Sequence, residues 1–204
     1  MPPVKSWTEY PKACDMTQWK QTRKKKYQIW VCMPKLGTKV YNKLEDTYYT
    51  TNEKRPFVLS GTYGEQWIVD FDRLVKTYKI PDGTPFGKPI ILDELKKKGH
   101  PYKIDWFKIE TVDDPTIQWA FFVEKNLKLS VQTSWGDTLL ANRAGVSHGY
   151  GDYLVCADIQ GMPNMNDVWV VNGEVFPRTY NMSAFKGLAI QGDVNPPMPP
   201  SLIK

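Results

Sequence analysis

A twelve-residue segment occurs twice in this chain, and the repeat constrains the fold more than any other feature. The first copy is Trp67–Tyr78 and the second is Trp169–Tyr180, so the copies lie 102 residues apart (169 minus 67), half of the 204-residue chain. Trp, Val, Thr and Tyr are identical at the same offsets, and five further positions are conservative pairs. A repeat at a fixed offset predicts two related structural modules.

Each copy predicts a strand followed by a short helical element. In the first copy the apolar strand ends at Asp70, a good helix N-cap, and Asp72 precedes Lys76 by four residues, the favourable order on a helix. The second copy carries a proline inside the corresponding helix and begins it with the turn pair Asn172-Gly173. We therefore expect the two copies either to close differently or to share only a tight turn.

Short apolar runs rich in β-branched and aromatic residues, bounded by Gly and Pro, predict strands in both halves of the chain. We predict a mainly β protein with short helices, built from two tandem related small modules packed together, because modules of about 60 residues bury little surface alone. The predicted boundaries are an N-terminal arm at 1–24, a first β module at 25–80, a connector at 81–112, a second β module at 113–182 and a Pro-rich C-terminal tail at 183–204.

Composition excludes several classes of protein. The net charge of +5 is small for a dedicated nucleic-acid binder. Cys14, Cys32 and Cys156 form no C-x-x-C pair, which indicates free thiols in a reducing compartment. With only His100 and His148, a zinc site would need scattered ligands. The N-terminus has no apolar signal segment, and no run of about 18 apolar residues occurs, so we predict neither secretion nor a membrane span.

Two groups of polar residues carry the parts of a reactive site, and we interpret both as structural. His148, Asp152 and Cys156 combine imidazole, carboxylate and thiol, but flanking glycines predict a turn, and the first module has a serine in place of the cysteine. No metal-binding spacing joins the scattered carboxylates, Asp113, Asp114 and Asp137. No phosphate-binding loop motif is present. We therefore predict no catalytic residue, no metal and no cofactor.

The repeated aromatic residues would suit either a core or a stacking platform for nucleic-acid bases. Equal offsets in two modules favour equivalent core positions, so we assign a structural role to the repeated residues, Trp67, Val69, Thr77, Tyr78, Trp169, Val171, Thr179 and Tyr180. The acidic and basic residues matched within the same segments are interpreted as local ion pairs, Asp72 with Lys76 and Glu174 with Arg178.

Two segments outside the predicted modules are candidates for interactions. One is a basic run, Arg23, Lys24, Lys25 and Lys26. It suits either a solvated approach to the first strand or contact with phosphate or an acidic partner, and the lysines at 96–98 allow the same alternatives. The other segment favours polyproline II and contains Pro196, Pro197, Pro199 and Pro200.

The second module also carries a short pattern. Gly-Asp-Tyr-Leu-Val at 151–155, Gly-Glu at 173–174 and Phe-Pro-Arg-Thr-Tyr at 176–180 resemble a small β-rich domain of phage and other viral genomes. The first module matches at 64–65 and 74–78, although it lacks the preceding Gly-Asp. Gly-Glu normally precedes the aromatic strand in that domain, so 173–174 are out of register. The resemblance implies a viral origin and a β-rich module, and it carries no activity.

A duplicated, aromatic-rich chain with extended arms resembles a minor structural protein of a large DNA virus. We therefore predict a non-enzymatic minor capsid or capsid-associated protein, located in the virion and made in the host cytoplasm. Its expected partners are other capsid proteins or copies of itself, bridged through the arms and aromatic surface. One alternative is a viral protein that binds or sequesters a small ligand such as a nucleotide. Another is an accessory protein with weak nucleic-acid contact.

Overall fold

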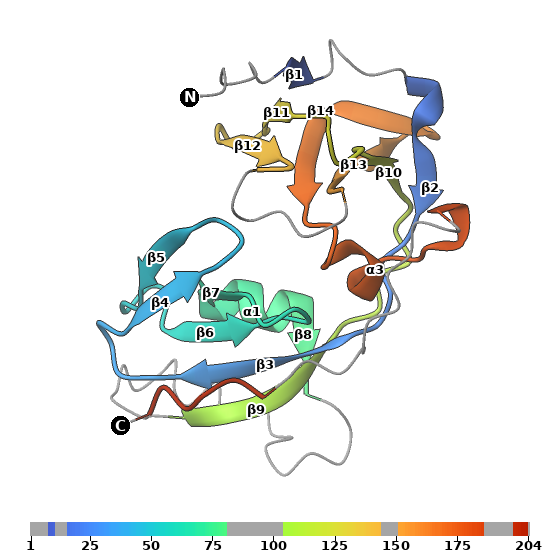
Figure 1. Cartoon of the computed structure of the whole chain (residues 1–204). Helices are drawn as coiled ribbons and strands as arrows, with labels where there is room; N and C mark the ends of the chain where they lie inside the picture. Colours follow the sequence, from blue (N-terminus) through green and yellow to red (C-terminus); the bar gives the residue numbers. More distant parts are fainter. Residues whose placement is uncertain (1–7, 11–15, 81–103, 144–150, 186–197, 204) are drawn as a thin grey trace, which may run out of the picture. The chain divides into compact units, whose positions relative to one another are not determined.

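The computed structural model describes residues 8–10, 16–80, 104–143, 151–185 and 198–203 (Figure 1). Strands hold far more of these residues than helices do, and the helices are short, which confirms the predicted mainly β class. Among the described residues, no helix has both the length and the apolar character needed to cross a membrane.

The elements are bounded as follows. The strands are β1 (Thr8–Tyr10), β2 (Lys20–Thr22), β3 (Gln28–Met33), β4 (Lys39–Asn42), β5 (Thr47–Thr50), β6 (Phe57–Ser60), β7 (Gln66–Val69), β8 (Tyr78–Lys79), β9 (Ile104–Thr111), β10 (Gln118–Phe122), β11 (Leu129–Gln132), β12 (Thr138–Ala141), β13 (Tyr153–Ile159) and β14 (Met162–Val171). The helical elements are η1 (Met16–Gln18), α1 (Phe71–Thr77), α3 (Phe176–Thr179) and η2 (Ser183–Phe185).

The chain divides into two compact units whose boundaries differ from the predicted modules. The first unit is Lys26–Asp113 with Asp193–Lys204, and the second is Met1–Lys25 with Asp114–Gly192. The predicted arm therefore contains β2, a strand of the second unit, and the predicted connector contains β9, a strand of the first unit. The described part of the predicted tail, 198–203, also belongs to the first unit.

In the first unit, an antiparallel sheet has the order β7-β6-β3-β9-β8, and β4 and β5 form a separate hairpin. In this hairpin Val40 stands opposite Tyr49, and Tyr41 stands opposite Tyr48. Alternating burial along β9 supplies two core side chains, Phe107 and Ile109. The rest of this core includes Ile29, Val31, Met33, Phe57, Leu59, Val69 and Leu74.

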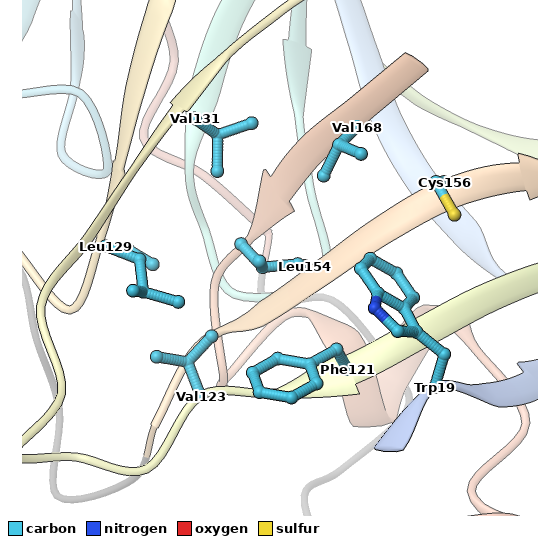
Figure 2. Close-up of a cluster of buried hydrophobic side chains, with 9 residues drawn as sticks. Trp19, Phe121, Val123, Leu129, Val131, Leu154, Cys156 and Val168 are labelled. Atoms are coloured by element: carbon cyan, nitrogen blue, oxygen red, sulfur yellow. The ribbon is translucent and has the colours of Figure 1, made fainter. Parts of the chain in front are cut away.

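The second unit repeats this arrangement with different connectivity. Its main sheet has the order β14-β13-β10-β2, and β11 and β12 form a hairpin to which β1 adds in parallel. Figure 2 shows Trp19, directly before β2, beside the ring of Phe121 on β10, with ring centroids 5.9 Å apart. The predicted arm therefore contributes to a hydrophobic core, because Trp19 is almost fully buried there.

The strand pairings of the two units correspond residue by residue. Trp67 and Trp169 stand on equivalent edge strands, β7 and β14. Crossing the first sheet from Trp67, the successive neighbours are Leu59, Val31 and Phe107. Crossing the second sheet from Trp169, the successive neighbours are Val155, Ala120 and Lys20. In each unit the hairpin lies in sequence between the third and second strands of this path.

The helical segments also end alike. Tyr78 and Tyr180 have nearly the same extended backbone, with φ −129° and ψ 155° against φ −125° and ψ 156°. Their amide N–H groups donate to the carbonyl oxygens of Leu74 and Phe176, which are likewise 102 residues apart. The copies differ in helix length, since α1 has 7 residues and α3 has 4, but both helices close in the same way.

One strand comes from a different place in the chain in each unit. The strand next to β3 is β9, which follows the repeat segment, whereas the strand next to β10 is β2, which precedes it. Pairing Thr22 with Gln118 in the second unit therefore closes a loop of 96 residues (118 minus 22). A disordered loop of that length costs about 4 kcal/mol to close. Folding of the first unit shortens the loop, because the Lys26 ammonium lies 3.0 Å from the Asp113 carboxylate.

Candidate functional site

The first unit contains a pocket of about 410 Å³. The hairpin end, β7 and the first turn of α1 contribute to its wall. Its lining mixes aromatic, apolar and charged side chains from these elements and two loops, namely Asn42, Leu44, Glu45, Tyr49, Arg55, Glu65, Trp67, Ile68, Val69, Asp70 and Arg73.

Some charged side chains of the pocket form hydrogen bonds within the protein, and others do not. The Asp70 carboxylate accepts from the Arg73 backbone N–H at 2.8 Å, as a helix N-cap does, and the Glu45 carboxylate accepts from the Tyr49 hydroxyl. Within the described residues, the exposed guanidinium groups of Arg55 and Arg73 have no hydrogen-bond or ion-pair partner. These two arginines are thus charged donors of the pocket that no described residue occupies.

Glu65 is part of the turn that joins β6 to β7. Its carboxylate accepts from the Tyr63 N–H at 2.9 Å, and the side chain is buried. A Cβ on Gly61 would fall 1.9 Å from Oε1 of Glu65, so only glycine leaves room for this carboxylate. Gly64 has φ of +74°, a conformation that glycine adopts at little cost. The Gly-Glu pair of the first module is therefore a structural feature of this turn.

The Gly-Asp pair of the second unit is also structural. A Cβ on Gly151 would lie 1.9 Å from the Val123 carbonyl oxygen, so the backbone there admits only glycine without a shift. The buried Asp152 carboxylate accepts from the backbone N–H groups of Asn142 at 2.7 Å and Gly173 at 3.0 Å. Asn142 in turn accepts from the Asp152 N–H at 2.7 Å. This network joins the ends of three strands.

The side chains considered for a nucleophilic site have structural roles where the structure describes them. His148 lies outside the described residues. Asp152 is committed to backbone N–H groups, and Cys156 is fully buried in the core shown in Figure 2. Burial raises the pKa of the Cys156 thiol to about 12, so the thiolate needed for nucleophilic attack is disfavoured. Burial raises the pKa of Cys32 as well.

The raised thiol pKa values predict slow modification of the folded protein. In a Cys14→Ser background at pH 8, we expect Cys32 and Cys156 to react with an aromatic disulfide reagent at least about a thousandfold more slowly than in urea, because burial shields both sulfur atoms from the reagent and raises the pKa of both thiols. A group with a raised folded pKa contributes stability that is complete below the unfolded pKa of about 8.5 and is lost as the pH rises towards 12. Equal rates of thiol modification in the folded protein and in urea would contradict the buried positions of the two cysteines.

The scattered carboxylates do not converge. Asp113 pairs with Lys26, and Asp137 accepts from the Trp135 indole N–H at 2.9 Å. Hydrogen bonds from Thr116 hold the pKa of Asp114 below its usual value. Within the described ranges, no group of three Asp, Glu, His or Cys side chains is arranged to hold a metal ion.

Contacts within the protein account for most of the basic run. The backbone of 23–25 pairs with 179–181, including a bridge between Lys24 and Tyr180. The Lys25 ammonium donates to the Pro177 carbonyl oxygen at 2.8 Å, and burial lowers its pKa. A hydrogen bond to Asp113 raises the pKa of Lys26. Arg23 is exposed, and the lysines at 96–98 lie outside the described residues.

The predicted proline-rich interaction segment is in part bound to its own unit. The Trp106 indole N–H donates to the Pro200 carbonyl oxygen at 2.9 Å, and Leu202 packs against the cluster around Cys32. Pro199 is half-buried in the same segment, whereas Pro196 and Pro197 lie outside the described residues. The described end of the chain is therefore not an extended arm.

Most of the repeated residues lie in or against hydrophobic cores. In the first unit Trp67 and Tyr78 pack against the core, and Val69 is buried within it. In the second unit Tyr180 and Thr179 are buried, and Trp169 and Val171 pack against the adjoining cluster. Thr77 is half-buried at the end of α1. The predicted ion pair between Glu174 and Arg178 is present at 2.8 Å.

Sequence reasoning missed the pocket residues Arg55, Arg73 and Tyr49, because the pocket is assembled from separate segments. A signal was available at one of them. Most positions of the repeat are matched, but Arg73 stands opposite Val175. An unmatched charge on a repeated scaffold indicates a role in one copy alone.

Comparison of the chain with protein-family models, curated proteins and solved structures finds no match.

Proposed function

We propose that the protein is a non-enzymatic structural component, and that it serves in a virus particle as a minor capsid or capsid-associated protein. The observation that carries the structural role is the use of the repeated and motif residues. Gly-Glu forms a turn, Gly-Asp joins strand ends, and the repeated Trp, Val, Thr and Tyr residues pack in or against hydrophobic cores. The viral setting comes from the sequence resemblance.

We assign binding of other particle proteins to a surface of the folded first unit, in place of the predicted N-terminal and C-terminal arms. The outer face of the β4–β5 hairpin carries Tyr41 and Tyr48, exposed by 44% and 68%, with ring centroids 5.1 Å apart. Lys39 and Thr50 are exposed on the same face. Exposed tyrosines are enriched at interfaces because they offer a large apolar area with a polar end. We assign this face to contact with another protein of the particle.

The test is incorporation of the chain into virus particles purified from infected cultures. We expect the wild-type chain to co-purify with particles, and we expect Tyr41→Ser with Tyr48→Ser to lower its content several-fold. Leu36→Ser is the matched control, because Leu36 is a large apolar residue exposed by 44% outside this face. Absence of the wild-type chain from every particle would overturn the capsid role, and full incorporation of the double variant would overturn the assigned surface.

A further inference from the structure

We propose that the pocket of the first unit binds a nucleoside monophosphate. This site is independent of the capsid role, and the two arginines assigned to its phosphate group are not scaffold residues of the repeat. A volume of about 410 Å³ lies within the range of small-molecule sites, and apolar and polar groups converge on it.

The phosphate group is assigned to Arg55 and Arg73. Both side chains are exposed, both line the pocket, and within the described residues neither guanidinium has a hydrogen-bond or ion-pair partner. A guanidinium presents a planar set of donors that matches a phosphate group with paired hydrogen bonds. Two such groups in one pocket thus supply the donors that a phosphate ester requires.

The base is assigned to the aromatic part of the same pocket. Tyr49 and Trp67 line it, and stacking of a base on such rings is favourable for every base. Asp70 uses Oδ1 for the helix cap, and its second oxygen offers an acceptor to an amino or hydroxyl group of the ligand. The pocket therefore offers both an anion-binding part and a part suited to a nucleoside.

The charge of the lining selects a monophosphate over more highly charged nucleotides. Two arginines face three carboxylates, Glu45, Glu65 and Asp70. A ligand with several phosphate groups would place charge close to these carboxylates, where like charges repel. A single phosphate group bound by the two arginines is attracted by their positive charge and places the least negative charge near the carboxylates.

Comparison with the second unit separates ligand binding from scaffolding. The residue 102 positions after Leu74 is Phe176, which is also buried, and the residue 102 positions after Asp70 is Asn172, whose side-chain oxygen accepts from the Glu174 backbone N–H. The residue 102 positions after Arg73 is Val175, which is the N-cap residue of α3 and carries no charge. The scaffold is therefore built without an arginine at this position.

The experiment is isothermal titration of the full-length protein with adenosine and uridine monophosphates, adenosine and inorganic phosphate. We expect both monophosphates to bind, and we expect Arg55→Ser and Arg73→Ser each to weaken binding by about tenfold or more, because each removes charged hydrogen bonds. Lys54→Ser and Lys76→Ser are matched controls, since both lysines are exposed near these arginines and neither lines the pocket. We expect the controls to bind like the wild type.

Three results would overturn the proposal. One is failure of both monophosphates to bind at millimolar concentration. A second is unchanged binding by the variant that lacks both arginines, with circular dichroism showing that it is folded. A third is inorganic phosphate binding as tightly as the monophosphates, which would reduce the pocket to an anion site. Tighter binding of the monophosphates than of either adenosine or phosphate supports it.

Discussion

Replacing Phe176 with alanine is expected to lower the free energy of unfolding of the second unit by about 3–5 kcal/mol. The side chain is fully buried. Its ring is stacked at 3.9 Å from Tyr153 and at 4.7 Å from Tyr180, between ring centroids, and meets Phe185 edge-on at 5.7 Å. Truncation removes the apolar transfer energy of the ring and leaves a cavity among rings that cannot close it. Urea unfolding followed by circular dichroism measures the change.

Two comparisons make this expectation specific. Phe176→Leu keeps most of the volume, so its effect should be clearly smaller. Hydrogen exchange across the urea transition should show the second unit of Phe176→Ala losing protection while the first unit keeps it. Leu74→Ala, the matched change in the first unit, should weaken both units, because an unfolded first unit restores the long loop between Thr22 and Gln118. If Phe176→Ala lowered hydrogen-exchange protection equally in both units, the expectation that the second unit depends on the first, and not the reverse, would be contradicted.

Asp152→Ala is expected to destabilise the second unit by about 3–5 kcal/mol, because it leaves two buried backbone donors without acceptors. The carboxylate accepts from Asn142 N–H at 2.7 Å and from Gly173 N–H at 3.0 Å, and it is 6% exposed. Asn142 depends on the same network, since it holds φ of +58° while its amide group donates to the carbonyl oxygens of Glu124 and Leu127. The urea midpoint of the second unit measures the loss.

The control for this network is Asp137→Ala. Asp137 is exposed, and its side chain accepts only the Trp135 indole N–H among its described hydrogen bonds, so its loss should change stability by less than about 1 kcal/mol. Asp152→Asn keeps one acceptor oxygen and should recover part of the lost stability. If Asp152→Ala were as stable as Asp137→Ala, the Gly-Asp pair would have no structural role in joining these strand ends.

Residues that are close in sequence determined what could be predicted at the level of local structure. The Asp70 cap, the start of α1 after it and the pairing of Glu174 with Arg178 all follow from side chains within one or two helical turns of each other. A strand pattern indicates which face is buried, but it does not indicate which neighbouring strand is hydrogen-bonded to it.

The residues of the pocket could not be predicted from the sequence either, because they come from separate segments. Arg55 lies in the polar loop after β5, Trp67 lies on an edge strand and Arg73 lies on a helix. No spacing in the sequence relates these three, because they meet only when the hairpin and β7 have packed together. Sequence reasoning therefore recognised Trp67 as a scaffold residue of the repeat and missed the two arginines that line the cavity beside it.

By itself the sequence determined the β-rich class, the matched Trp-to-Tyr segments and the helical turn that follows each strand, because alternation, capping and turn preferences act over a few residues. Only the tertiary structure decided that β2 and β9 join sheets on the far side of the repeat segments. The first has 3 residues with the buried Trp19 directly before it, and the second has 8 residues and contains the buried Trp106. Their local patterns identify each as a strand, but long-range backbone pairing selects the sheet that each one completes.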